Sequence, residues 1–387
     1  MKHVTRSLLA ACLALSAVPA GAQSEVVVPA VPSAQDVPIA FLADLGSGQI
    51  LHARDADRRF VPASVTKVMT TFIAFEMLDE GRLKPDQVFT MDRQTFRDWG
   101  RKGSSMFLNE GDQATVDQLL HGITTVSAND GCAVMAVGAT GSVEKWVALM
   151  NAKARELGMT NSHFGTPNGW MDEGRTFVSA RDLFILSRAL ITRHPELYRR
   201  YIGKPSYSFN GIVQSNHDPM IGHVPGADGI KTGFTRQAGY NYLGSAERDG
   251  RRLLMVIAGT DRPAIRTQAA RAFIEWGFTH FATRTLFAAG KPVARAAIQG
   301  GAARSVPLVA SRPLVVSFAN GTDPEISLMV HYTGPLKAPV QAGAEVAELE
   351  IKIAGQEPFR TPLVAAESVA QANWWQRVRN GLAELFA

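Results

Sequence analysis

The pattern of apolar and polar residues predicts a pair of short strands followed by a deeply buried helix. Residues 39–42 and 50–52 are predicted to be two short strands, and Gly46-Ser47-Gly48 supplies the turn between them. From 65 to 78 the sequence VTKVMTTFIAFEML is apolar on nearly every side and contains neither glycine nor proline. This pattern predicts a helix that is buried all round rather than one that lies at the surface.

The central part of the chain is predicted to be helical. Gly158 is placed to end one of these helices, and Ser179 is placed to cap the start of another. Apolar residues recur at helical spacing in residues 115–125, 131–137, 143–157 and 179–191.

After residue 229 the period changes from helical to alternating. An Asp249-Gly250 turn between two alternating runs indicates a hairpin, and residues 265–276 return to a helical pattern. Strands at both ends of the region with helices between them predict an α+β domain, in which one antiparallel sheet is covered by helices. The strands predicted after residue 229 are 230–235, 239–246 and 251–259.

Beyond the first domain, glycine and proline separate short β-rich runs, which predicts a β-sandwich over 285–365. The stretch from Ser368 reads as an amphipathic helix, with Trp374 and Trp375 on its apolar side. It is too short to span a bilayer but suits a helix that lies in the membrane interface. Docking of this helix on the β-sandwich is the alternative. The β-rich runs are 293–298, 313–318, 327–331 and 345–353.

The first 22 residues contain basic, apolar and small residues in the order that is typical of a secretory signal peptide. Lys2 and Arg6 precede the apolar run LLAACLALSAVPA, and Ala20-Gly21-Ala22 follows it, so we predict cleavage after Ala22. Leu9 to Cys12 also resembles a lipoprotein box, but a cut there would truncate the apolar region. A flexible linker rich in proline, alanine and valine is predicted over 23–37.

Composition and charge restrict the number of domains, the disulfides and the binding partners that can be expected. The 387 residues are 46% hydrophobic, which is enough for two or three folded domains. Removal of the signal peptide takes away Lys2 and Arg6 and no acid, so the formal charge falls from +5 to +3 and does not predict nucleic-acid binding. Only Cys132 then remains of the two cysteines, so no internal disulfide is expected. The histidines form no metal-binding motif, and no metal or other cofactor is predicted.

The candidate chemistry lies in three short motifs. Ser64 and Lys67 are three residues apart, which places a hydroxyl and an amine on one face of a helix, as a nucleophile and its base. Alone, this pair also fits a helix cap and a lysine that reaches the solvent. Ser127-Ala128-Asn129 and Lys231-Thr232-Gly233 follow it in the order that marks penicillin-binding proteins and class A β-lactamases.

On these residues the chain resembles the low-molecular-mass penicillin-binding proteins, and in particular the serine-type D-alanyl-D-alanine carboxypeptidases. The resemblance implies a β-lactamase/transpeptidase-like domain with a helical subdomain over 38–284, then the small all-β sandwich, then an amphipathic membrane-anchor helix over 366–387. The flanking matches are Pro62-Ala63, Asp228-Gly229-Ile230, Ala238-Gly239-Tyr240-Asn241 and Trp276-Gly277-Phe278.

Peptide cleavage through an acyl intermediate requires a nucleophile, a base, a proton donor and an oxyanion site. Ser64 is expected to attack the carbonyl. Lys67 is expected to be the base, if burial and a second cation, Lys231, lower its pKa. The resemblance assigns to Ser127 the transfer of a proton to the leaving amine. It assigns to Asn129 the holding of the substrate amide and the orientation of Lys67.

The rest of the expected site binds the substrate. Lys231 and Thr232 suit a terminal carboxylate, and the resemblance adds Arg266, with Arg262 as a weaker alternative. Gly233 is expected to let the substrate backbone lie close against its strand. The oxyanion hole is expected to use backbone N–H groups, those of Ser64 and Phe234, and residues 104–108 are expected to line the site.

The resemblance implies an enzyme that removes the terminal D-alanine from peptidoglycan stem peptides ending in D-Ala-D-Ala and that β-lactams acylate. It implies a place in the periplasm, on the outer face of the inner membrane. A D,D-endopeptidase and a silent wall-binding module are alternatives. A class A β-lactamase is disfavoured because E-x-x-L-N is missing. Ala128, Phe234 and Asn168 depart from frequent family residues, which bears on substrate preference and deacylation. Cys132 is expected to be a buried thiol.

Overall fold

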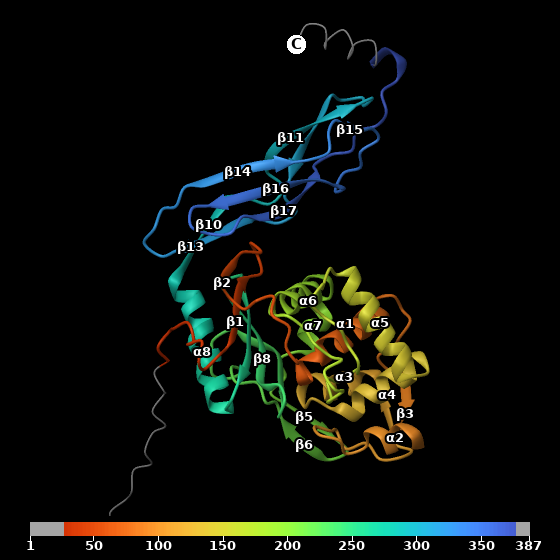
Figure 1. Cartoon of the computed structure of the whole chain (residues 1–387). Helices are drawn as coiled ribbons and strands as arrows, with labels where there is room; N and C mark the ends of the chain where they lie inside the picture. Colours follow the sequence, from red (N-terminus) through yellow and green to blue (C-terminus); the bar gives the residue numbers. More distant parts are fainter. Residues whose placement is uncertain (1–26, 377–387) are drawn as a thin grey trace, which may run out of the picture.

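The computed structural model describes residues 27–376, which form an α+β domain followed by an all-β domain (Figure 1). The predicted signal peptide and residues 377–387 of the predicted terminal helix lie outside the described residues. Within 27–376, no single helix is long and apolar enough to cross a membrane. Helices α4 (Asn129–Thr140) and α5 (Val143–Glu156) meet that test only as a pair, which is bent by 89°.

A five-stranded antiparallel sheet joins the two ends of the first domain, in the order β2-β1-β9-β8-β7. Phe41 in β1 lies opposite Val256 in β9, so the first strand of the domain pairs with the last. The sequence prediction of a sheet assembled from both ends is confirmed. The strands are β1 Ile39–Asp44, β2 Ile50–Arg54, β7 Ala227–Thr235, β8 Gly239–Arg248 and β9 Arg251–Thr260.

Helices cover both faces of this sheet because its strands alternate two sets of apolar side chains. Leu42 points to one face and packs in a cluster with Phe273 of α8. Phe41 points to the other face and packs in a larger cluster with Phe72 of α1 and Phe184 of α6. The helices are α1 Lys67–Asp79, α2 Arg93–Trp99, α3 Val116–Thr125, α4, α5, α6 Ala180–Arg193, α7 Pro195–Tyr201 and α8 Pro263–His280.

The helix predicted over 65–78 is confirmed as a short 3-10 turn, η1 (Ala63–Thr66), that leads into the buried helix α1. The predicted cap is also present, because the side chain of Ser179 accepts a hydrogen bond from the backbone N–H of Asp182 at the start of α6. Two small antiparallel pairs, which the pattern did not predict, border the helical part: β3 Val88–Thr90 with β4 Gln113–Thr115, and β5 Ser206–Phe209 with β6 Ile212–Ser215.

The second domain consists of a six-stranded sheet, β14-β16-β17-β12-β11-β15, and the pair β10-β13. Strand β10 follows α8 directly, so the predicted boundary between residues 284 and 285 falls inside a strand. The strands are β10 Phe281–Phe287, β11 Pro292–Gln299, β12 Ser305–Val309, β13 Leu314–Ala319, β14 Ile326–His331, β15 Leu336–Lys337, β16 Glu345–Ile353 and β17 Phe359–Ala365.

The predicted start of the terminal helix at Ser368 is wrong. Val369 forms an antiparallel bridge with Val340, and Gln371 forms another with Gly301, so this stretch is extended and belongs to the β domain. Val369 is buried, and this contact fixes an extended backbone where the sequence also suits a helix. Helical backbone begins at Trp374.

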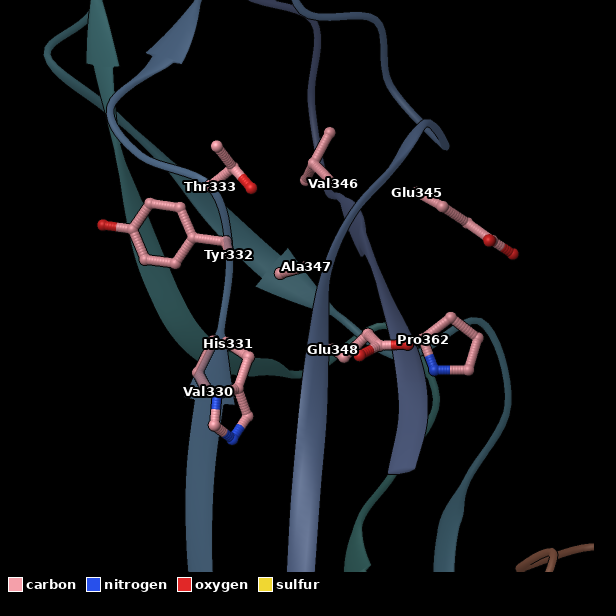
Figure 2. Close-up of a pocket in the computed structure, with 9 residues that line it drawn as sticks. All are labelled: Val330, His331, Tyr332, Thr333, Glu345, Val346, Ala347, Glu348 and Pro362. Carbon is pink, nitrogen blue, oxygen red and sulfur yellow. The ribbon is translucent and has the colours of Figure 1, made fainter. Parts of the chain in front are cut away.

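A cavity with a volume of about 640 Å³ lies in the β domain (Figure 2). Its walls come from the end of β14, the start of β16 and Pro362 of β17. Tyr332 follows the end of β14, and Val346 lies near the start of β16 (Figure 2). The cavity contains no pairing of a nucleophile with a base, and the three motifs lie in the other domain.

Candidate active site

Ser64 and Lys67 lie at the junction of η1 and α1, and their side chains meet as the spacing predicts. The Nζ of Lys67 lies 2.8 Å from Ser64 Oγ, 2.7 Å from Asn129 Oδ1 and 2.8 Å from the backbone oxygen of Asn168. Two of these neighbours are carbonyl oxygens that only accept hydrogen bonds. A neutral Lys67 therefore donates its two N–H groups to Asn129 and Asn168, which directs its lone pair at the Ser64 hydroxyl.

The backbone around the nucleophile has unusual geometry. Ala63, directly before Ser64, has a φ of +49°, and Ser127 has a φ of +63°, a left-handed region that few residues other than glycine adopt. Gly169 packs against this turn: a Cβ there would lie 1.8 Å from the backbone oxygen of Ala63. The neighbouring loop therefore requires glycine at 169, and this close contact helps to hold Ser64 in place.

The second motif lies between α3 and α4, so its polar groups reach the site from the first turn of α4. Asn129 accepts from Lys67 and donates through Nδ2 to the backbone oxygen of Lys102 at 2.7 Å. The Oγ of Ser127 is buried and has no hydrogen-bond partner. A buried hydroxyl without a partner is costly, which suggests that a bound substrate completes its hydrogen bonding.

Asp130, the next residue, fixes the segment that the sequence places near the site. Its carboxylate accepts hydrogen bonds from Ser105 Oγ at 2.6 Å, from Met106 N at 3.1 Å and from Leu108 N at 3.0 Å. Ser104, at the start of this segment, lines the cleft.

The third motif lies on β7, at the edge of the sheet next to η1. Lys231 is buried and donates to the backbone oxygen of Thr232 at 3.1 Å. The structure shows a different reason for glycine at position 233 from the one predicted. A Cβ at 233 would lie 2.4 Å from the backbone oxygen of Pro62, so glycine is required by the packing of β7 against η1.

Burial changes the protonation of both lysines. Desolvation lowers the pKa of Lys67 to about 8, although the nearby carboxylate of Asp130 acts in the opposite direction. Desolvation, and after it the charge of Lys67, lowers the pKa of Lys231 to about 7. Each amine therefore has a substantial neutral fraction near neutral pH, as a lysine base requires.

Two cavities meet at Ser64, and together they form the cleft. The first has a volume of about 350 Å³ and is lined by Ser127, Thr232, Gly233 and Arg266; we call it the cationic chamber. The second, of about 400 Å³, is lined by Asn129, Gly169, Trp170, Met171, Thr235 and Arg236; we call it the acyl chamber. Ser64, Ser104 and Phe234 line both chambers.

The structure thus brings together all nine residues predicted for the site. Lys67 and Lys231 are buried beside the cleft and do not line it, whereas the other seven do. Arg266 lines the cationic chamber and its alternative, Arg262, does not. Sequence reasoning missed further lining residues on irregular segments or beyond the motifs: His217, Trp170, Met171, Tyr240 and Arg236.

Cys132 is fully buried in α4, as expected, and burial raises the pKa of its thiol to about 12. It is therefore a neutral thiol at physiological pH and a poor nucleophile. No group of three or more histidine, cysteine, aspartate or glutamate side chains is arranged to hold a metal ion in the part of the chain that the structure describes.

A serine, an amine base, a second hydroxyl and a cationic chamber around one cleft define a serine acyl-transfer enzyme. Residues 11–262 match the family described as D-alanyl-D-alanine carboxypeptidase, and residues 281–371 match the family described as penicillin-binding protein 5, C-terminal domain. The chain therefore belongs to the D-alanyl-D-alanine carboxypeptidase family. The predicted class, a low-molecular-mass penicillin-binding protein with serine carboxypeptidase activity, is confirmed.

Known proteins agree with this assignment along most of the chain. D-alanyl-D-alanine carboxypeptidase DacD of Escherichia coli is 34% identical, over 87% of this chain and 88% of that protein. Penicillin-binding protein 5 of Haemophilus influenzae superposes with a TM-score of 0.75 at 29% identity, over 90% of this chain and all of that structure. Penicillin-binding protein D2 of Listeria monocytogenes, solved with ampicillin bound, superposes with a TM-score of 0.57 at 28% identity, over 63% of this chain and 98% of that structure.

Proposed function

We propose that this enzyme removes the terminal D-alanine of peptidoglycan stem peptides, with Ser64 as the nucleophile and Lys67 as its base. The observation that carries the proposal is the 2.8 Å contact between Lys67 Nζ and Ser64 Oγ. The two other neighbours of that amine accept hydrogen bonds only, so the hydroxyl of Ser64 is the proton donor available to a neutral Lys67.

The reaction proceeds in two halves. Ser64 Oγ attacks the carbonyl of the penultimate D-alanine while its proton passes to Lys67. Backbone N–H groups of Ser64 and Phe234 stabilise the oxyanion, a contribution of about 3 kcal/mol per donor. Ser127 then delivers a proton to the leaving amine and receives one from Lys67, so D-alanine departs and Lys67 is neutral again. Water attacks the ester on Ser64 and gives its proton to Lys67, which passes that proton to Ser64 Oγ as the ester bond breaks.

The cationic chamber receives the carboxylate of the leaving D-alanine. Arg266 and Thr232 line it and offer donors, and Lys231, buried next to Thr232 in β7, adds positive charge when it is protonated. Asn129 holds both Lys67 and the Lys102 loop, so its amide is fixed where the substrate backbone passes. Strained β-lactams carry a carboxylate beside a reactive amide and are expected to acylate Ser64 by the same steps.

The test combines a pentapeptide ending in D-Ala-D-Ala with a fluorescent penicillin. We expect the wild-type enzyme to release one D-alanine, measured by mass spectrometry, and to become covalently labelled. Ser64→Ala is expected to remain folded, to lose labelling and to lower kcat by at least about 1,000-fold. Ser327→Ala, an exposed serine in the β domain, is the matched control. Covalent labelling of Ser64→Ala would exclude Ser64 as the nucleophile, and cleavage of cross-linked peptides alone would indicate an endopeptidase.

We further propose that the enzyme is exported by residues 1–22 and held on the outer face of the inner membrane, in the periplasm, by its terminal helix. Trp374 and Trp375 support this, because their exposed rings stack 3.7 Å apart at the start of that helix. Exposed tryptophans next to arginines favour the membrane interface.

Deletion of residues 373–387 is expected to move the enzyme from the membrane pellet to the soluble fraction. The cleft is in the other domain, so penicillin labelling of the soluble fraction should persist. The full chain, fractionated in parallel, is the control. A truncated enzyme that still sediments tightly with membranes would contradict the anchor.

A further inference from the structure

The two chambers of the cleft differ in chemistry, and this difference fixes the direction in which a peptide lies. The cationic chamber contains Arg266, whereas the acyl chamber is walled by Trp170, Met171 and Phe234. The terminal carboxylate belongs in the cationic chamber on charge grounds. Since the chambers meet at Ser64, the part of the peptide before the scissile bond must enter the acyl chamber.

Apolar side chains that line the acyl chamber are exposed to solvent. Phe234 is 49% exposed, and it is kept in place by stacking on Tyr240, with ring centroids 4.2 Å apart. Met171, which also lines this chamber, is 53% exposed. The ring of Trp170 packs so closely on Gly103 that a Cβ there would lie 2.6 Å from it. Exposed apolar side chains that line one cavity indicate a binding surface for an aliphatic group.

The described residues that line the acyl chamber carry positive charge and no negative charge. Arg236 is exposed and lines it, and no aspartate or glutamate is among the described residues that do so. No ion pair with Arg236 is present within residues 27–376. The chamber therefore combines an apolar wall with an uncompensated guanidinium, which favours an anionic group and disfavours an ammonium.

We propose that the acyl chamber selects the residue before the penultimate D-alanine by its side chain, favouring an aliphatic body that ends in a carboxylate. Trp170, Met171 and Phe234 would contact the methylene groups, and Arg236 would pair with the carboxylate. This proposal rests on the function proposed above and adds the substrate class that the same site accepts.

The test uses three acetylated peptides, X-D-Ala-D-Ala, that differ only in the side chain of X: L-2-aminoadipate, its side-chain amide, and L-lysine. D-alanine release is followed at low ionic strength, where exposed charges are least screened. We expect kcat/KM of the wild type to be about three- to fivefold higher for the carboxylate than for its amide, and lowest for lysine, as suits one solvent-exposed ion pair.

Substitutions of Arg236 test whether this residue causes the preference for the carboxylate. We expect Arg236→Gln to bring the carboxylate-to-amide ratio to about one, and Arg236→Glu to make lysine the preferred side chain. Arg304→Gln removes an exposed arginine of the β domain and is expected to retain the wild-type ratio. Added salt should lower the ratio in the wild type and leave it unchanged in Arg236→Gln.

The outcomes separate the two proposals. Equal release from all three peptides by the wild type would overturn the acyl-chamber selectivity and leave the carboxypeptidase function standing. A wild-type ratio that persists in Arg236→Gln would also overturn it. Release of D-alanine from none of the peptides would overturn the proposed function, and the selectivity with it.

Discussion

Lys67 and Lys231 are two buried amines beside one cleft, and the proposed chemistry needs them in opposite states. Lys67 must be neutral to accept the proton of Ser64, whereas Lys231 must be charged to attract a carboxylate. Burial lowers the pKa of Lys67 to about 8 and that of Lys231 to about 7. Because the two amines interact, the pair loses its protons in two steps, and the productive form keeps one of them. The lower pKa of Lys231 places that proton mainly on Lys67, so the productive arrangement, with neutral Lys67 and charged Lys231, is the minor form of the singly protonated pair.

A bell-shaped pH profile of kcat/KM for D-alanine release is therefore expected. Activity should rise as the pair loses its first proton near pH 7 and fall as it loses the second near pH 8. Lys231→Arg keeps a charge that is not lost in this range, so its falling limb should move to higher pH, and its rising limb should then report the titration of Lys67 alone.

The measurement is the rate of D-alanine release between pH 6 and pH 10, with the rate of penicillin acylation as a second readout. Lys291→Arg, an exposed lysine of the β domain, is the matched control and should leave both limbs in place. A falling limb that stays where it is in Lys231→Arg would show that another group controls it.

At the scale of secondary-structure elements, the helices and strands with a periodic apolar pattern were those that the sequence predicted. The buried α1, the strands β7 to β9 and the helices α3 to α6 follow from apolar spacing, and three motifs at their ends place most of the site. The pairs β3-β4 and β5-β6 are only three or four residues per strand, so their pairing depends on tertiary contacts and leaves little pattern.

The site residues that the sequence did not predict were missed for the same reason. Trp170 and Met171 lie on an irregular loop, where position depends on contacts such as that of Gly169 with Ala63. The third partner of Lys67 is the backbone oxygen of Asn168, an atom that every residue has, so no residue type marks it. The misplaced helix start at Ser368 came from ambiguous apolar spacing that the contact of Val369 with Val340 resolves.

At the scale of the whole molecule, buried polar groups join the two domains. Gln49, beside the turn between β1 and β2, accepts a hydrogen bond from Ser317 N at 2.6 Å and donates to Ser317 O at 2.9 Å. Asp44 accepts from Ser317 Oγ at 3.1 Å and pairs with Arg251 at 2.9 Å. Figure 1 shows the β domain meeting the first domain beside these strands. Such contacts are directional, so they fix an orientation as well as an association.

Gln49→Ala is expected to loosen this junction without changing the cleft. The substitution leaves the buried N–H of Ser317 without its partner, and an unsatisfied buried group costs about 1–3 kcal/mol. Because the lost groups lie between the domains, the two domains should unfold separately, giving two calorimetric transitions where a single transition is expected of the wild type. Penicillin labelling should persist, since Gln49 does not line either chamber.

Gln341→Ala, an exposed glutamine of the β domain, is the matched control and should unfold as the wild type does. Small-angle scattering provides a second measurement, because separated domains increase the radius of gyration. A single transition at the wild-type temperature, with unchanged scattering, would mean that apolar contacts between the domains suffice. In the expected case, the polar contacts set the direction in which the β domain extends from the catalytic domain, and therefore how far a terminal anchor places the cleft from the membrane.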